Sequence, residues 1–413
     1  MDQQQQLEEF VDIRKKSSKI LIFGPFVKFI KLTGLDCSAL ARYRNGKGNR
    51  CLGYFTHIMA IGVIITMISR VMTYMSVEAK ICSNYLVQYH FFHPLSFAWS
   101  ESNVYGFMAI QAVVCTFCLY GWTKNQFISK FLKNFDEVKL LRLSTNDTID
   151  DYSGTHKKCF LFPIPLFFIL MTASLFVAVH KKFTFGGQEV SQIQYIIMPC
   201  LMFLTWMIVS LTLIIYNLVH STLNREIEFF NEELQKASDD KLLLDRKTFA
   251  AFSHRQLEIV KLVKNANESL GSYAKVAPLF CFFSLINAIY NLSFSSITPQ
   301  VYFICLLAFV FTLIAIIIFS LKPPTSLQDN LAATSKILIL NEEIETTADA
   351  RIYQTYRIMV DRSLNYDTKL YLINGFPITS SSFNIAMFVV PNLGPCLMLT
   401  KKILEANGIN VNQ

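Results

Sequence analysis

The residues best suited to binding chemistry lie inside long apolar stretches of the sequence. Amide, indole, phenol and thioether side chains occur there at mid-depth or toward the outer end, and the candidates for contact with a ligand are Gln111, Met202, Trp206, Asn287, Tyr290 and Tyr302. Small-molecule sites combine aromatic walls with a few polar anchors, which these side chains supply. The pattern indicates a ligand pocket, and ordinary packing between helices through polar side chains is the other explanation.

A second group of candidates lies in the stretch 376–399. Hydroxyl and amide side chains make its first half hydrophilic, and apolar side chains occupy the next turns. A helix with a wet half and an apolar ring suits the wall of an ion pore, where the constriction excludes water. The candidate pore residues are Ser381, Asn384, Val389 and Leu393. A packed helix whose small residues let neighbours approach is the alternative.

Patterns typical of catalysis are missing from the sequence. It has no Ser, His and Asp in the order of a hydrolase, no glycine-rich phosphate loop, and no Asp or Glu inside the apolar stretches. His90 and His93 are three residues apart, as metal ligands on one helical face can be. The aromatic residues around them favour a belt at the membrane surface instead. We therefore expect no enzymatic activity, no metal and no cofactor.

These side chains must be positioned by helices that cross a membrane. Apolar residues make up 52% of the 413 residues and charged residues only 16%. About 20 apolar residues span the hydrocarbon core as a helix, and lipid leaves no other partner for the backbone. The predicted fold is all-α with seven transmembrane helices, at 51–74, 103–121, 159–179, 195–219, 273–295, 300–320 and 376–399. Pro391 and Pro395 are expected to bend the last one. Arg70 is expected to extend to the outer membrane surface, or to pair with a ligand carboxylate or a nearby carbonyl.

The distribution of Lys and Arg predicts the orientation. Ten lie in residues 1–50, seven in 122–158, eight in 220–272 and six in 321–375, against five in all the alternate segments together. Lys and Arg stay on the cytoplasmic side. The amino terminus is therefore predicted to be cytoplasmic and the carboxyl terminus extracellular.

This orientation divides the chain into five parts. Residues 1–50 are a cytoplasmic segment with an interfacial helix near Ile20–Ile30, and residues 51–320 hold six transmembrane helices and the cytoplasmic helical loop 220–272. Residues 321–375 form a cytoplasmic amphipathic helix, 376–399 the seventh transmembrane helix, and 400–413 an extracellular tail. Apolar residues at three- and four-residue steps predict that the helices around the loop 220–272 continue well past the membrane.

The start of the last stretch carries a resemblance to a known family. Residues Leu372–Ile378 read LINGFPI and are followed by Ser380–Phe383. Together with the inverted seven-helix layout, this segment resembles the insect gustatory and odorant receptor superfamily. Residues Val390–Pro395 replace that family's Thr-Tyr-x5-Gln-Phe signature. The departure points to a nematode branch, the gustatory-receptor-like proteins or the serpentine receptors of class R.

The resemblance implies a chemosensory receptor that is itself a ligand-gated cation channel. Its implied partners are the lipid bilayer, a small-molecule ligand, permeating cations and further copies or relatives in a homo- or hetero-tetramer, and no nucleic acid. A cytoplasmic anchor would join the subunits, and the seventh helix would line the pore. The implied location is the plasma membrane, as a multi-pass protein of sensory neurons.

Two other functions are consistent with the composition. A seven-helix receptor that signals through a G protein or another partner would face the opposite way. The sequons at Asn146 and Asn267 lie in the segments predicted to be cytoplasmic, so glycan on either would reverse the orientation. A transporter or membrane assembly protein is the third possibility, and a transporter would more often show internal repeats, of which the sequence has none.

Overall fold

Long helices dominate the computed structural model, which describes residues 22–24, 26–44, 46, 49–85, 97–143, 152, 154–157, 192–292, 300–365, 368–372 and 375–407. Six helices in these ranges are long and apolar enough to cross a membrane. They are α4 (Arg50–Tyr85), α5 (Phe97–Lys124), α9 (Gln192–Asp239), α10 (Arg246–Asn291), α11 (Gln300–Ile339) and α14 (Ser380–Ala406). Each overlaps a predicted transmembrane stretch, and the predicted stretch 159–179 lies outside the described residues.

Shorter elements connect or flank these helices. They are α2 (Phe26–Leu32), α3 (Ser38–Arg44), α6 (Phe127–Lys139), the 3-10 turn η2 (Leu242–Leu244), α12 (Glu342–Glu345), α13 (Ala350–Asn365) and the strands β1 (Tyr371–Leu372) and β2 (Phe376–Pro377). The strands pair antiparallel, with Tyr371 opposite Pro377. Helical residues do occur in the stretch Ile20–Ile30, at Ile22–Phe23 and again from Phe26, the start of α2; Gly24, with a positive φ of 47°, separates the two pieces.

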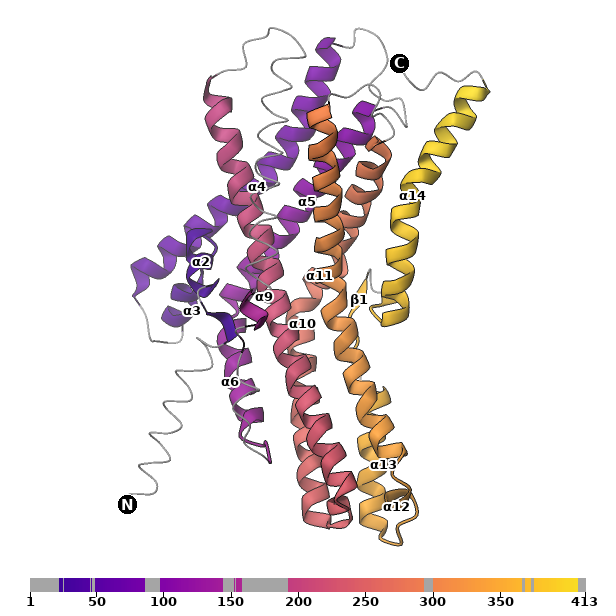
Figure 1. Ribbon diagram of the computed structural model, residues 1–413. Coiled ribbons are helices and arrows are strands. Elements are labelled where there is room, and N and C mark those ends of the chain that lie inside the picture. Colours follow the sequence, from indigo (N-terminus) through magenta and orange to yellow (C-terminus); the bar gives the residue numbers. More distant parts are fainter. Residues whose placement is uncertain are drawn as a thin grey trace.

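Three helices run almost the full length of the molecule (Figure 1). α9, α10 and α11 have 48, 46 and 40 residues, roughly twice the length that a bilayer requires. In Figure 1 the lower halves of these helices form a second bundle with α12 and α13, while α4, α5 and α14 accompany only their upper halves. The long helical extensions predicted from the sequence are confirmed. They carry the Lys- and Arg-rich segments at the end assigned to the cytoplasm.

The turn between α9 and α10 explains why both helices end where they do. Lys241 adopts a left-handed conformation with φ 56°, which stops α9. Asp245 then caps α10, since its carboxylate accepts hydrogen bonds from the Thr248 backbone N–H and hydroxyl. These hydrogen bonds hold the pKa of Asp245 below its ordinary value.

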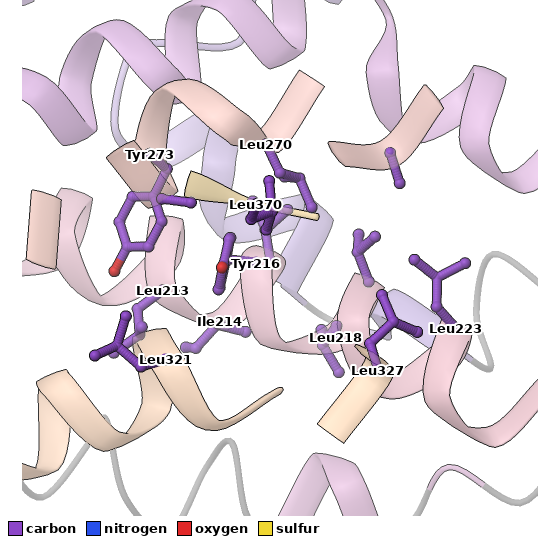
Figure 2. Close-up of a cluster of buried hydrophobic side chains, with 14 of the residues drawn as sticks. Leu213, Ile214, Tyr216, Leu218, Leu223, Leu270, Tyr273, Leu321, Leu327 and Leu370 are labelled. Atoms are coloured by element: carbon purple, nitrogen blue, oxygen red, sulfur yellow. The ribbon is translucent and has the colours of Figure 1, made fainter. Parts of the chain in front are cut away.

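A layer of buried apolar side chains joins the two halves of the molecule (Figure 2). Its members come from α9, α10, α11 and the segment before β1, and include Leu213, Ile214, Tyr216, Leu218, Leu223, Leu270, Tyr273, Leu321, Leu327 and Leu370. The Tyr273 hydroxyl is 2.9 Å from Ser320 Oγ of α11. Leu370 belongs to this layer, and the adjoining strand β1, which precedes α14, lies against α10.

A cluster of four charged side chains is buried in the cytoplasmic half. Glu226 of α9 accepts from Arg255 of α10 at 3.0 Å and from Arg142, in the segment after α6, at 3.1 Å. Arg255 also pairs with Glu233. Both guanidinium groups lie 5.4 Å from the centre of the Phe229 ring. Arg255 is 1% exposed, so removing any partner leaves a charge that water cannot reach.

Replacing Arg255 by Met should lower the free energy of unfolding by about 3–5 kcal/mol, because Glu233 and Glu226 would each lose a buried partner. Thermal unfolding of the purified protein in detergent measures the loss. Arg246→Met is the control, since Arg246 pairs with Asp349 while its side chain is 61% exposed, and this variant should lose less than about 1 kcal/mol. Equal unfolding temperatures for the two variants would contradict the prediction.

Candidate functional site

Polar side chains bridge α5 and α10 in the membrane half of the structure. Ser100 Oγ donates to the Asn287 carbonyl at 2.9 Å, and Ser284 Oγ donates to the Val104 carbonyl at 3.2 Å. Further along the same contact, Cys281 Sγ lies 3.4 Å from Gln111 Oε1. In lipid such bonds help set the relative position of two helices, since apolar surface alone gains little by leaving lipid.

Three amide groups at this contact retain atoms without a partner among the described residues. These atoms are Gln111 Nε2, Asn287 Oδ1 and Asn291 Oδ1. Gln111 is fully buried and Asn291 is 1% exposed, while Asn287 Nδ2 donates within its own helix to the Phe283 carbonyl. A buried amide atom that lacks a hydrogen-bond partner lowers the stability of the folded protein by about 1–3 kcal/mol. Buried polar atoms are usually satisfied by protein, water or ligand, so this contact is a candidate place for a bound polar group.

The predicted ligand-contacting residues fall on four helices, α5, α9, α10 and α11. Gln111 and Asn287 share the contact between α5 and α10, and Tyr290 is fully buried on α10. Met202 and Trp206 lie on α9, where Trp206 is buried and Met202 half-buried. Tyr302 lies on α11, and its side chain is outside the described part of the structure. The structure therefore places two of the six residues, Gln111 and Asn287, at one polar contact. That the six residues together line a ligand pocket stays a prediction.

Arg70 is held between helices. Its Nη1 donates to Thr205 Oγ1 of α9, and Thr205 in turn donates to the Leu201 carbonyl at 2.7 Å. The extension of Arg70 to the membrane surface stays a prediction, and the structure adds a hydroxyl partner on α9. The guanidinium stays half-buried because a hydroxyl acceptor is within its reach.

A shallow hollow open to solvent lies at the opposite end of the molecule. It is lined by Asn231, Glu232, Gln235, Lys236, Asp239, Asp240 and Ile337 of α9 and α11. Its walls are mostly charged or amide side chains of the cytoplasmic bundle. This composition does not match the aromatic and apolar walls of a small-molecule pocket, and we assign no ligand to it.

α14 is the least covered of the long helices. Only 11% of its most apolar window is buried, against 72% for α9. The predicted pore residues Ser381, Asn384, Val389 and Leu393 are all exposed, and together they extend over about half of the helix circumference. Pro391 and Pro395 do not interrupt the helix, which is continuous from Ser380 to Ala406.

The covered side of α14 approaches α10 closely at Gly394. A Cβ added there would lie 2.5 Å from Ile289 Cγ2 and 3.3 Å from the Ile286 carbonyl oxygen. Real Cβ atoms do not approach so closely, so only glycine lets the two helices pack at this distance. The contact fixes which side of α14 faces its own chain.

The start of α14 is anchored by residues that the sequence did not single out for this purpose. The Thr368 carbonyl accepts from Asn267 Nδ2 of α10 and, at 2.9 Å, from Gln328 Nε2 of α11. Ser380 Oγ donates to Asp329 Oδ2 of α11 at 2.5 Å. Asn267, the first residue of a sequon, is thus buried in a contact. Since these partners lie 40 to 101 residues apart in the chain, no local pattern could reveal them.

Comparisons with known proteins agree with this geometry. The family model described as "Caenorhabditis protein of unknown function, DUF267" matches residues 22–394. The olfactory receptor OR5 of the insect Machilis hrabei in complex with eugenol has 11% identity and a TM-score of 0.63, over 91% of this chain and all of that chain. The structure of OR5 alone gives 12% identity and the same TM-score, over 90% of this chain and 99% of OR5. Comparison with curated proteins gave no match.

These likenesses confirm two predictions from the sequence. The fold is the all-α membrane fold of the insect olfactory receptor OR5, and the Caenorhabditis family agrees with a nematode branch. At 11–12% identity the two chains share a fold, and side chains in the site are not carried over from one to the other.

Replacing Gly394 by Ala should destabilise the packing of α14 by about 1–3 kcal/mol, because the new methyl group overlaps Ile289. Ile289→Ala in the same chain should recover part of the loss, and a double-mutant cycle on thermal unfolding measures this coupling. Gly62→Ala on α4 is the control, since an added Cβ there meets nothing within 4 Å. Additive effects of the two substitutions would show that α14 does not lie against α10 at this point.

Proposed function

The chain belongs to the Caenorhabditis DUF267 family and has the fold of an insect olfactory receptor, and from these premises we propose that it is a chemosensory receptor that forms a ligand-gated cation channel. Four subunits would surround a pore lined by α14. The stimulus would be a small molecule bound among the outer halves of the other helices. The location that follows is the plasma membrane of sensory cells.

The observation that carries this proposal is that α14, largely uncovered by its own chain, exposes polar side chains in its first half. Ser381 and Asn384 are exposed, yet α14 is apolar enough to cross a membrane. Polar side chains that face lipid cost free energy, and they are normally directed toward other helices or a water-filled path. Four copies of α14 around an axis would give these side chains water, and Val389 and Leu393 would form the apolar ring above them.

The start of α14 supports passage of cations. Asp329 lies beside Ser380 at the cytoplasmic end of the helix, where a ring of four carboxylates would attract cations toward the proposed pore. No Lys or Arg lies between Ser380 and Leu399. The charges near the pore thus favour positive ions until Lys401 and Lys402, beyond the apolar ring.

The ligand is expected at the polar contact of α5 with α10 and its surroundings. The related OR5 was solved in complex with eugenol, a small molecule. In this chain the unpartnered amide atoms of Gln111, Asn287 and Asn291 supply hydrogen-bonding groups, and Trp206, Met202, Tyr290 and Tyr302 remain the proposed aromatic and apolar contacts. A ligand with one or two polar groups would satisfy this combination.

Signalling through a G protein is the competing function, and orientation separates the two. In that case residues 122–158 and 220–272 would be extracellular. Buried Asn267, hydrogen-bonded to Thr368, is a poor glycan acceptor whichever way the chain faces. Tags at both termini, or glycan at Asn146, therefore decide the question. The direct test of the channel is conductance in a non-excitable cell that expresses the chain, recorded while chemicals are applied and G-protein signalling is blocked.

Replacing Ser381 or Asn384 by Leu should change single-channel conductance or relative ion permeability several-fold, because an apolar side chain narrows and dries the proposed pore. Patch-clamp recording measures both quantities. Thr66→Leu on α4 is the matched control, since Thr66 is also exposed and its hydroxyl bonds its own helix. Unchanged permeation in both α14 variants, at equal surface expression, would remove α14 from the pore.

Replacing Gln111 by Leu should reduce sensitivity to the activating compound by about tenfold, since a hydrogen bond from Gln111 Nε2 to a bound ligand is worth about 1–3 kcal/mol. The concentration for half-maximal current measures this shift. Gln256→Leu in the cytoplasmic bundle is the control, because that amide already donates to Met359 and Ser363. It should lower stability and leave the half-maximal concentration unchanged. If the Gln111→Leu protein were more stable and its half-maximal concentration unchanged, Gln111 would have a packing role and no role in ligand binding.

A further inference from the structure

Two short helices beside the start of α4 carry an unusual concentration of exposed positive charge. Lys28 and Lys31 of α2, Arg42 and Arg44 of α3, and Arg50 at the start of α4 are all exposed. Asp36 is the sole acidic residue between positions 22 and 58 of the sequence. It is half-buried, and its carboxylate accepts from the Ser38 backbone N–H at 3.0 Å. We call these five side chains the basic patch.

The basic patch is mounted on a well-packed support. Phe26, Ile30 and Leu40 are buried, and the Leu35 carbonyl between the helices accepts from Thr123 Oγ1 of α5 at 2.7 Å. α3 also lies against α4, because a Cβ added to Gly53 would be only 3.1 Å from the Leu40 backbone. Burial of apolar side chains thus holds these helices in place. The five charged groups stay at the surface, where Arg42 donates to the Ser38 carbonyl at 3.4 Å and Arg50 lies over the Tyr54 ring at 5.8 Å.

Apolar side chains are exposed next to the basic patch. Leu32 is 68% exposed and Phe29 38%, on the same short helix as Lys28 and Lys31. The exposed apolar surface continues onto the first turns of α4, at Leu52 and Phe55, where the membrane-crossing segment begins. Figure 1 shows α2 and α3 beside this end of α4. A helix with alternating basic and apolar exposed residues at the end of a membrane span matches an interfacial element.

We propose that the basic patch binds the headgroups of anionic lipids in the cytoplasmic leaflet. The phosphate or carboxylate groups of these lipids would pair with the five Lys and Arg side chains, while Leu32 and Phe29 insert among the upper acyl carbons. The charge complementarity and the position beside the membrane-crossing part of α4 favour lipid over a soluble partner. The inference concerns lipid binding alone and does not depend on whether the chain conducts ions.

The test uses the full-length purified protein in detergent and measures lipid adducts by native mass spectrometry. The probes are a phosphatidylinositol bisphosphate and, as the uncharged comparison, phosphatidylcholine. The fourfold variant Lys28→Gln, Lys31→Gln, Arg42→Gln and Arg44→Gln should bind the anionic lipid roughly 600-fold more weakly, since each of the four charges contributes roughly fivefold. Binding of phosphatidylcholine should not change.

Two controls keep the result interpretable. Lys130→Gln with Lys133→Gln removes exposed charge from α6 and should leave lipid binding unchanged. A variant with Arg at positions 28 and 31 in place of Lys keeps the charge and should retain binding. Equal affinity of the fourfold variant and the unaltered chain, at equal thermal stability, would overturn the proposal and reassign the patch to an acidic protein partner. Equal binding of phosphatidylcholine and the anionic lipid would overturn it as well.

Discussion

The cytoplasmic half of the protein depends on one buried charge cluster. Glu226 is almost fully enclosed and accepts from both Arg142 and Arg255, and Arg255 also holds Glu233. Because a buried charge is tolerated only when it is paired, α9, α10 and the segment after α6 can meet in one register only. Amide contacts between α9 and α11, such as Asn231 Nδ2 to the Asn330 carbonyl at 2.8 Å, add the third long helix to this arrangement.

α10 extends this arrangement from the charge cluster into the membrane-crossing half. α10 is continuous from Arg246 to Asn291, so the register set at Arg255 also sets the level of Ser284 and Asn287, which bond α5. Lipid is as apolar as a helix surface, and polar contacts of this kind have a larger part in positioning helices there. α10 also positions α14. Asn267 of α10 donates to the Thr368 carbonyl in the segment before α14, and Ile289 of α10 packs against Gly394 of α14.

Local patterns in the sequence were sufficient to predict the helices. They were insufficient to predict which residues make contact between helices. Apolar runs and the bias of Lys and Arg predicted the spanning helices and the extensions of α9, α10 and α11, because both signals reside in contiguous residues. The partner of Arg70, Thr205, is 135 residues away in the chain and was not predicted. The anchoring of Thr368 and the role of Gly394 were likewise hidden, because each depends on a helix distant in the chain. Tyr302 and the span 159–179 remain predictions.

Local sequence and single-chain packing disagree at several places, and two of these bear on the proposed function. Ser381 and Asn384 are polar on a helix that its own chain leaves largely uncovered, and Gln111, Asn287 and Asn291 bury amide atoms that the described residues leave unbonded. Other buried polar atoms also lack a partner among the described residues, for example both ring nitrogens of His220. Natural proteins break such agreement mainly where function requires it. A water-filled path shared by several subunits would resolve the first conflict and a bound polar molecule the second, so the proposed ligand-gated channel would account for both.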